Sequence, residues 1–205
     1  MATVDWPTSR AFAPAGISLV LDVSEQSAVG AYTGNRTHRS NLADRMVLTL
    51  TLAPCLRADA YRREAFLLGV RSRRDWIRMG VPARETPAGT ARGTMLAVGA
   101  HAAGVRTLSI DGISPSTGTL IGGDILSVGA NTLLMVAYAG ATASGGAASV
   151  PLVSPLPVAL SDNAPVAWST PKGIWELDED GLQLDYSAPV VQAGVAIRLR
   201  QVISS

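Results

Sequence analysis

The stretch Met46-Val-Leu-Thr-Leu-Thr-Leu52 alternates side chains with a period of two. Leu48, Leu50 and Leu52 fall on one face of an extended chain, and the residues between them fall on the other. This alternation is typical of a strand that buries one face in an antiparallel sheet. The stretch therefore predicts a mainly β fold.

The same alternation recurs towards both ends of the chain. Residues 17–23 place four apolar side chains on one face: Ile17, Leu19, Leu21 and Val23. Residues 195–200 alternate aliphatic side chains with arginines, and residues 182–186 also alternate. Between the first two strands, residues 32–41 are polar and rich in turn formers. They predict a loop or the tip of a long hairpin.

One helix is expected over residues 55–69. Pro54 suits its beginning and Gly69 its end. An apolar stripe with spacings of three and four is expected to face the core, and it comprises Leu56, Ala60, Tyr61, Ala65 and Leu68. A short strand over residues 75–79 is expected to follow.

The middle of the chain has a different character. Residues 81–93 combine proline, glycine and charge, which is typical of a connector. Beyond them, short apolar runs separated by glycine turns predict a small barrel, and these runs are 105–110, 123–128 and 132–138. Five prolines then interrupt residues 151–173, which are expected to be irregular or an edge strand.

The composition indicates a surface covered by partners. Hydrophobic residues make up 47% and charged residues 16% of the 205 residues, against about 25% charged in ordinary domains. Mean hydropathy is +0.24. Residues 1–92 hold 13 arginines and 8 acids, whereas residues 93–205 hold 4 bases and 8 acids. Large apolar surfaces on folded proteins usually mark interfaces.

Several protein classes are disfavoured by simple features. The longest apolar run, residues 133–141, is far shorter than the roughly 18 residues of a spanning helix, so no membrane partner is expected. No signal segment is expected at the N-terminus. The single cysteine, Cys55, cannot form an internal disulfide and is expected to be a buried structural thiol.

Motifs for catalysis or cofactor binding were not found. The sequence lacks the phosphate-loop, dinucleotide, zinc-protease and nucleophile-elbow patterns. His38 and His101 have no partners suggested by a motif and are expected to be surface histidines. The run Glu176-Leu-Asp-Glu-Asp-Gly181 resembles only part of a calcium loop, so an acidic turn is expected. We therefore expect no enzyme and no catalytic, cofactor-binding or metal-binding residues.

A basic cluster follows the expected helix. It comprises Arg71, Arg73, Arg74 and Arg78, and such a cluster can contact phosphate. Nucleic-acid sites usually add stacking aromatics, and the one nearby, Trp76, is expected in the core. We expect subunit contacts or a solvated loop here, and no sequence-specific nucleic-acid binding.

Five passages together carry a resemblance to a known family. They are Arg10-Ala-Phe-Ala-Pro14, the turn and strand of residues 99–112, Gly118-Thr-Leu-Ile-Gly-Gly-Asp-Ile-Leu-Ser-Val-Gly129, Pro165-Val-Ala-Trp168 and Lys172-Gly-Ile-Trp-Glu-Leu177. In this order and spacing, over roughly residues 10–200, the chain resembles the distal tail proteins of long-tailed phages. The short, two-domain kind is the most similar.

The resemblance implies a fold with two parts. Residues 1–92 and 156–205 would form a ring-forming hub domain, a tail-tube-like β-barrel or sandwich with one helix. Residues 93–155 would form a small, inserted, OB-like β-barrel at the periphery. No catalytic or cofactor residues come with the family.

The resemblance also implies a function and partners. The protein would be a structural virion protein, made in the host cytoplasm, whose hexameric ring joins the tail tube to the tail tip or baseplate. Its partners would be copies of itself, the tail tube protein, the tail hub or tip proteins and the tape measure protein. The ring would leave a central channel for DNA, and the acidic run 176–180 is one candidate for lining it.

Three alternatives remain open. A tail tube or tube-terminator subunit would share the first domain but has no need of residues 93–155. A tail-borne carbohydrate-binding module could use Trp168 and Trp175 as stacking platforms, although a core role is expected for both. An enzyme would have to assemble a site from isolated residues such as Asp111, Asp124 and Asp162.

Overall fold

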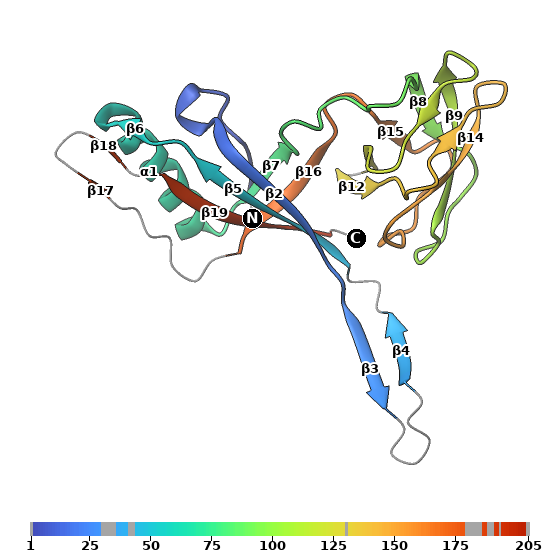
Figure 1. The fold of residues 1–205 in the computed structure, drawn as a ribbon, viewed down its shortest axis with the longest axis horizontal. Helices are drawn as coiled ribbons and strands as arrows, with labels where there is room; N and C mark the ends of the chain where they lie inside the picture. Colours follow the sequence, from blue (N-terminus) through green and yellow to red (C-terminus); the bar gives the residue numbers. More distant parts are fainter. Residues whose placement is uncertain are drawn as a thin grey trace. The chain divides into compact units, whose positions relative to one another are not determined.

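The computed structural model describes residues 2–29, 36–40, 44–129, 131–178, 186–187, 191–192 and 194–203. These residues are mainly β, with one long helix, so the predicted fold class is confirmed (Figure 1). Contacts divide the chain into two compact units. The first comprises residues 1–20, 46–83 and 172–202, and the second comprises 21–45, 84–171 and 203–205. Most of the second unit is thus inserted into the first.

The first unit is built on a six-stranded sheet. Its order is β1 (Thr3–Asp5), β7 (Trp76–Gly80), β16 (Lys172–Leu177), β19 (Val195–Gln201), β5 (Arg45–Leu52) and β2 (Pro14–Asp22). β1 runs parallel to β7, whereas the pairs from β7 through to β5 are antiparallel. The chain's beginning, middle and end therefore share one sheet.

The register between β19 and β5 aligns the two alternating patterns found in the sequence. Val195 lies opposite Leu52, Ile197 opposite Leu50, and Leu199 opposite Leu48, and all six side chains are buried. The predicted inward faces of both strands are thus confirmed. Cross-strand aliphatic pairs of this kind are the main stabilising unit of a sheet.

Aromatic side chains complete the core of the first unit. Trp175 of β16 is fully buried, and its indole Nε1 donates a 2.9 Å hydrogen bond to the carbonyl oxygen of Met79. Trp6, Phe12 and Phe66 pack edge to face, with ring centroids 5.3–5.8 Å apart. Phe12 ends a short 3-10 helix, η1 (Arg10–Phe12), which packs against the long helix.

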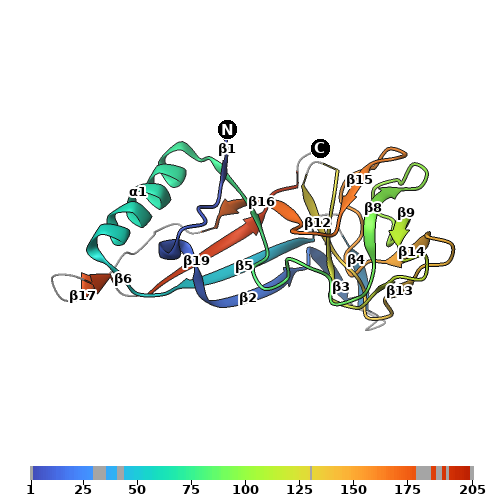
Figure 2. The same ribbon diagram turned by 90° about the horizontal axis from the view of Figure 1, so that it is seen from above.

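The helix α1 (Arg57–Arg73) extends one turn beyond the predicted end and lies on one side of the sheet (Figure 2). Of its predicted apolar stripe only Ala60 is buried, and the prediction is wrong for the other four residues. The buried side chains are Ala60, Arg63, Leu67 and Val70, whereas Tyr61 and Leu68 are 50% and 46% exposed. The buried face differs from the predicted one because it includes the charged residue Arg63. Backbone carbonyls accept hydrogen bonds from its guanidinium, which allows it to be buried.

The strand β2 also departs from the prediction. Ile17 of β2 is 39% exposed and Val23, which follows the strand, is 51% exposed, so neither faces the core. β2 is the last strand of its sheet and has only one neighbour there. Beyond it, β3 (Glu25–Val29) pairs with β4 (Arg36–Ser40) in an antiparallel hairpin. Residues 36–40 of the predicted loop are therefore a strand, and residues 32–35 and 41 lie outside the described residues.

The second unit contains a closed antiparallel barrel. Its order is β12 (Thr132–Met135), β11 (Ile125–Val128), β15 (Pro165–Ala167), β8 (Arg92–Ala97), β9 (Thr107–Ser114) and β14 (Ala148–Pro151). The bridge between Val136 and Leu152 joins the first strand to the last and closes the ring. A small antiparallel barrel was expected here; an OB-fold has five strands, and this barrel has six.

The strand β15 changes the domain boundaries. It pairs with β8 on one side and β11 on the other, so residues 156–171 belong to the barrel unit and not to the hub. The predicted barrel, residues 93–155, is too short at this end. The prolines of this segment had predicted irregular structure. Pro165 is nevertheless the first residue of β15, a position where the missing N–H is tolerated. The segments of the first unit on either side of the barrel are accordingly residues 46–83 and 172–202.

Three short strands form a further sheet in the first unit. They are β6 (Cys55–Leu56), β18 (Val191–Gln192) and β17 (Tyr186–Ser187). Cys55 is half-buried instead of buried. Of the predicted alternating residues 182–186, only Tyr186 lies among the described residues. None of the helices in the described part of the chain has the length and apolar character needed to cross a membrane.

Candidate functional site

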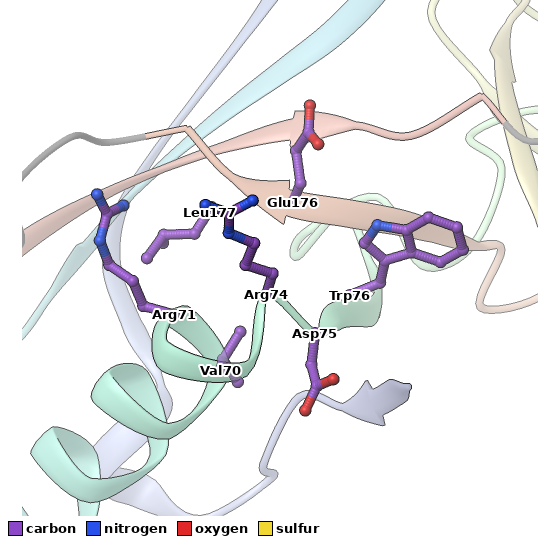
Figure 3. Close-up of a pocket in the computed structure, with 7 residues that line it drawn as sticks. All are labelled: Val70, Arg71, Arg74, Asp75, Trp76, Glu176 and Leu177. Atoms are coloured by element: carbon purple, nitrogen blue, oxygen red, sulfur yellow. The ribbon is translucent and has the colours of Figure 1, made fainter. Parts of the chain in front are cut away.

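The first unit has a groove of about 520 Å³ where α1 ends and β7 begins (Figure 3). The helix ends at Arg74, which adopts the left-handed conformation with φ 54° and ψ 38°. The residues that line the groove are Val70, Arg71, Arg74, Asp75, Trp76, Glu176 and Leu177. The groove thus combines two guanidinium groups, two carboxylates, an indole ring and aliphatic side chains.

Backbone hydrogen bonds hold the turn that shapes this groove. The N–H of Asp75 donates to the carbonyl of Val70 at 3.0 Å, and that of Arg74 donates to Arg71 at 3.2 Å. The Asp75 carboxylate accepts the N–H of Ala2 at 3.0 Å, and the N–H of Trp76 donates to the Ala2 carbonyl at 2.9 Å. These hydrogen bonds therefore fix the backbone that carries Arg71 and Arg74.

The groove is cationic on its helix side. Among the described residues, no ion pair or hydrogen bond occupies the guanidinium of Arg71 or Arg74. Figure 3 shows the Arg74 side chain reaching towards β16, whereas the Asp75 carboxylate points the other way. Guanidinium groups bind carboxylate or phosphate oxygens with paired N–H donors. This arrangement can receive an anionic group.

One row of exposed side chains on α1 is apolar. Tyr61, Ala65 and Leu68 lie on one exposed row of the helix, with spacings of four and three. At the start of the row, the Arg57 guanidinium lies 5.3 Å from the Tyr61 ring centroid, and its Nε donates to the Tyr61 hydroxyl. The residues predicted as core thus form a surface feature instead.

The predicted arginine cluster is split by the structure. Arg71 and Arg74 line the groove, and Arg73 is exposed on the last turn of the helix. Arg78 lies on β7 and makes a bidentate pair with Asp5 of β1, with N–O distances of 2.7 and 2.8 Å. Trp76 is half-buried and lines the groove instead of lying fully in the core.

A pH dependence follows from the Asp5–Arg78 pair. The hydrogen bond from Arg78 lowers the pKa of Asp5 below its ordinary value of 3.8. A carboxylate with a lowered pKa stabilises the fold above the unfolded pKa, and this stabilisation is lost as pH falls through the folded pKa. We expect Asp5→Asn to lower stability slightly at pH 6, and this effect to shrink as the pH falls below 3.8 through the lowered pKa of Asp5, as measured by urea unfolding. Arg78→Gln should lower stability by a similar amount. The double variant should be little less stable than either single variant, because both remove the same ion pair.

A second prediction concerns the left-handed residue at the end of α1. Arg74 has φ 54°, a conformation that costs less for glycine than for other residues. We expect Arg74→Gly to raise the free energy of unfolding by about 0.5–1 kcal/mol, since glycine is the preferred residue at this position. Arg73→Gly, one residue earlier within the helix, should instead lower it by a similar amount. Thermal and urea unfolding measure both changes.

The acidic run is partly neutralised by β19. Asp178 pairs with Arg198 at 3.2 Å, and Glu176 lies opposite Arg200 in the β16–β19 register. The predicted acidic turn therefore begins within β16 and continues just after it, while residues 179–181 lie outside the described residues. A channel lined by residues 176–180 would present fewer free carboxylates than the sequence indicates.

The isolated aspartates do not assemble a site. Asp124 is buried, and its carboxylate accepts backbone N–H groups from Ala88, Gly89 and Ile121. Asp162 accepts the N–H of Gly99 at 2.7 Å. Asp111 lies in β9, opposite Leu96. Within the described ranges, no group of three or more His, Cys, Asp or Glu side chains is placed to hold a metal ion.

The two tryptophans proposed for sugar stacking have different environments. Trp175 is fully buried in the first unit, so its expected core role is confirmed and it cannot stack on a glycan. Trp168 is half-buried in the second unit; its Nε1 donates to the Gly93 carbonyl, and the Arg92 guanidinium lies 5.0 Å from its ring centroid. The two rings therefore do not form a shared platform.

The Nε2 atom of His101 is buried and has no hydrogen-bond partner among the described residues. His101 is half-buried, and its backbone pairs with Leu160. The side chain of His38 lies outside the described structure. Comparisons with protein-family models and with curated proteins give no match to this chain. The surfaces above and the resemblance in the sequence are therefore the basis for a functional proposal.

Proposed function

We propose that this chain is a structural subunit of a long-tailed phage tail. Copies of it assemble as a ring, hexameric in the type that the sequence resembles, at the distal end of the tail tube. The ring joins the tube to the tail tip or baseplate and leaves a central channel for DNA. The chain contacts the tail tube protein, the tail hub or tip proteins and the tape measure protein, and it resides in the virion tail.

The observation that carries this proposal is the exposure of large apolar side chains on ordered elements of both units. Tyr138, on a turn of the barrel unit, is 100% exposed. Others lie on β6, on α1, on or beside β2, and on loops of the barrel unit, and they are Ile17, Val20, Val23, Leu56, Tyr61, Leu68, Val98 and Ile121. Burying such side chains against other subunits removes apolar surface from water, which is favourable.

The inserted barrel favours a distal ring over a plain tube subunit. A tube subunit needs only the ring-forming unit, whereas residues 84–171 add a separate closed barrel with its own core. This core comprises buried side chains from β8, β9, β11 and β14, among others, and Leu108, Ile110, Leu126 and Val150 are examples. A barrel that folds around its own core can be carried outside the ring without disturbing it.

Imaging and mass measurement test the proposal together. We expect mass photometry of the purified full-length chain to show a concentration-dependent oligomer, and negative-stain electron microscopy to show rings with a central opening. In particles that carry a tagged copy, an antibody against the tag should label the distal end of the tail tube. A strict monomer at high concentration, together with unlabelled tails, would contradict the proposal.

A further inference from the structure

We infer that a second copy of this chain pairs along β2 in the antiparallel direction, so that the first-unit sheets of the two copies become one continuous sheet. Such a contact is isologous, because each copy contributes the same strand. The inference does not rest on the proposed function. An isologous contact joins two copies, whereas a ring repeats a head-to-tail contact around its axis.

The strand β2 is an open edge of the six-stranded sheet in the first unit. Among the described strands it pairs only with β5, and the sheet ends there (Figure 2). At nine residues it is also the longest of these strands. An edge strand presents a row of unpaired N–H and C=O groups, which can pair with a strand of another chain. The chemistry of this edge therefore selects an extended strand as its occupant.

The edge at β2 lacks the charges and prolines that often protect edge strands from pairing. Residues 15–21 contain neither a charged residue nor a proline, and Ile17 and Val20 are 39% and 56% exposed. The opposite edge of the sheet, β1, is only three residues long and carries the ion pair between Asp5 and Arg78. Of the two edges of this sheet, β2 is therefore the one suited to strand addition.

The sequence of β2 is complementary to itself in the antiparallel direction. Pairing about the central residue, Ser18, places this serine opposite the same serine of the other copy. Ile17 then lies opposite Leu19, and Gly16 lies opposite Val20. The carboxylate at one end of the strand falls opposite the proline at the other end, so no like charges meet. A second β2 therefore fits this edge along its whole length.

Pairing with a second copy satisfies two open edges in one contact. Consecutive side chains of a strand alternate between faces, so Ile17 and Leu19 of both copies fall on the same face of the joined sheet. Each of these side chains gains a neighbour across the contact, which removes part of its apolar surface from water. The two serine hydroxyls meet at the centre, where one can donate a hydrogen bond to the other. A second copy is thus the occupant that both the backbone and the side chains of β2 support.

Cysteine cross-linking of the full-length chain tests the register. Residues directly opposite in an antiparallel pair have Cα atoms about 4.5–5.5 Å apart, within the range of about 4.4–6.8 Å found for disulfides. We expect Ser18→Cys in a Cys55→Ser background to form a disulfide-linked dimer roughly tenfold faster than Ser72→Cys, because pairing holds the two thiols together. Ser72 is exposed on α1 of the same unit and serves as the control. Equal rates on non-reducing gels would overturn the inference.

Charged substitutions at the same position test the pairing by sedimentation equilibrium. Ser18→Lys places two lysines opposite each other, so we expect the dissociation constant for self-association to rise roughly tenfold, and Ser18→Glu should act in the same way. An equimolar mixture of the two variants should associate about as tightly as the wild type, because opposite charges then meet. Ser72→Lys should leave the dissociation constant unchanged.

Folding and pairing can be separated in these variants. Ser18 is exposed, so its substitutions are expected to leave the fold intact, and circular dichroism checks each variant. The recovery in the mixture is a second safeguard, because an unfolded variant cannot regain association from another variant. Variants that are folded but show no recovery on mixing would overturn the inference.

The outcomes also distinguish this inference from the proposed function. If rings form but the Ser18 variants associate and cross-link like their controls, the inference is overturned and the ring proposal stands. If pairs form in a Ser18-dependent way but no ring is seen in solution or in particles, the inference stands and the ring proposal fails. A wild-type chain that stays monomeric at high concentration overturns the inference.

Discussion

Replacing Arg63 by alanine is expected to lower the free energy of unfolding by about 3–5 kcal/mol. Arg63 is only 1% exposed, although it lies in the middle of α1. Its Nε donates to the carbonyl oxygen of Ala11 at 3.0 Å, and a terminal nitrogen donates to that of Ala53 at 2.9 Å. The substitution leaves both acceptors without this donor and opens a cavity beneath the helix.

The matched control for this prediction is Arg62→Ala. Arg62 is the preceding residue, and its side chain is 78% exposed, so we expect a change within about 0.5 kcal/mol. Urea unfolding followed by circular dichroism measures both variants. Hydrogen exchange should also show lost protection in α1 and in η1, which Arg63 links through Ala11. Equal effects of the two substitutions would contradict the role given to Arg63.

Replacing Asp124 by alanine is expected to lower the free energy of unfolding by about 3 kcal/mol. Asp124 is 6% exposed, and its two carboxylate oxygens accept three backbone N–H groups. The distances are 2.8 Å to Ala88, 3.4 Å to Gly89 and 2.9 Å to Ile121. Alanine would leave these donors without this acceptor in a site that is largely closed to water.

The control for Asp124 is Asp162→Ala in the same unit. Asp162 is exposed and accepts one backbone N–H, that of Gly99, so we expect a loss of about 1 kcal/mol. Asp124→Asn should fall between the two, because the amide retains one acceptor oxygen. Hydrogen exchange resolved by peptide should place the lost protection of Asp124→Ala in residues 84–171. A loss no larger than that of Asp162→Ala would show that the three hydrogen bonds contribute little.

Part of the candidate site could be recognised from the sequence. The arginines after the helix are visible in the printed chain, and subunit contact was one of the roles expected for them. That Arg71 and Arg74 share a groove while Arg78 pairs with Asp5 depends on the left-handed turn at Arg74 and on the pairing of β1 with β7. These are contacts between residues distant in sequence, and no local pattern reports them.

The mainly β class and the inward faces of β5 and β19 follow from sequence patterns alone. Apolar side chains recur at every second residue of these strands because one face of each strand is buried in the core. The tertiary structure alone decided which face of α1 is buried. Backbone carbonyls from Ala11 and Ala53 solvate Arg63 there, so a charged residue replaces an aliphatic one and the apolar row is left outside. The tertiary structure also decided that residues 165–167, in a segment interrupted by prolines, form a strand of the barrel, because pairing with β8 and β11 outweighs the poor strand propensity of the segment.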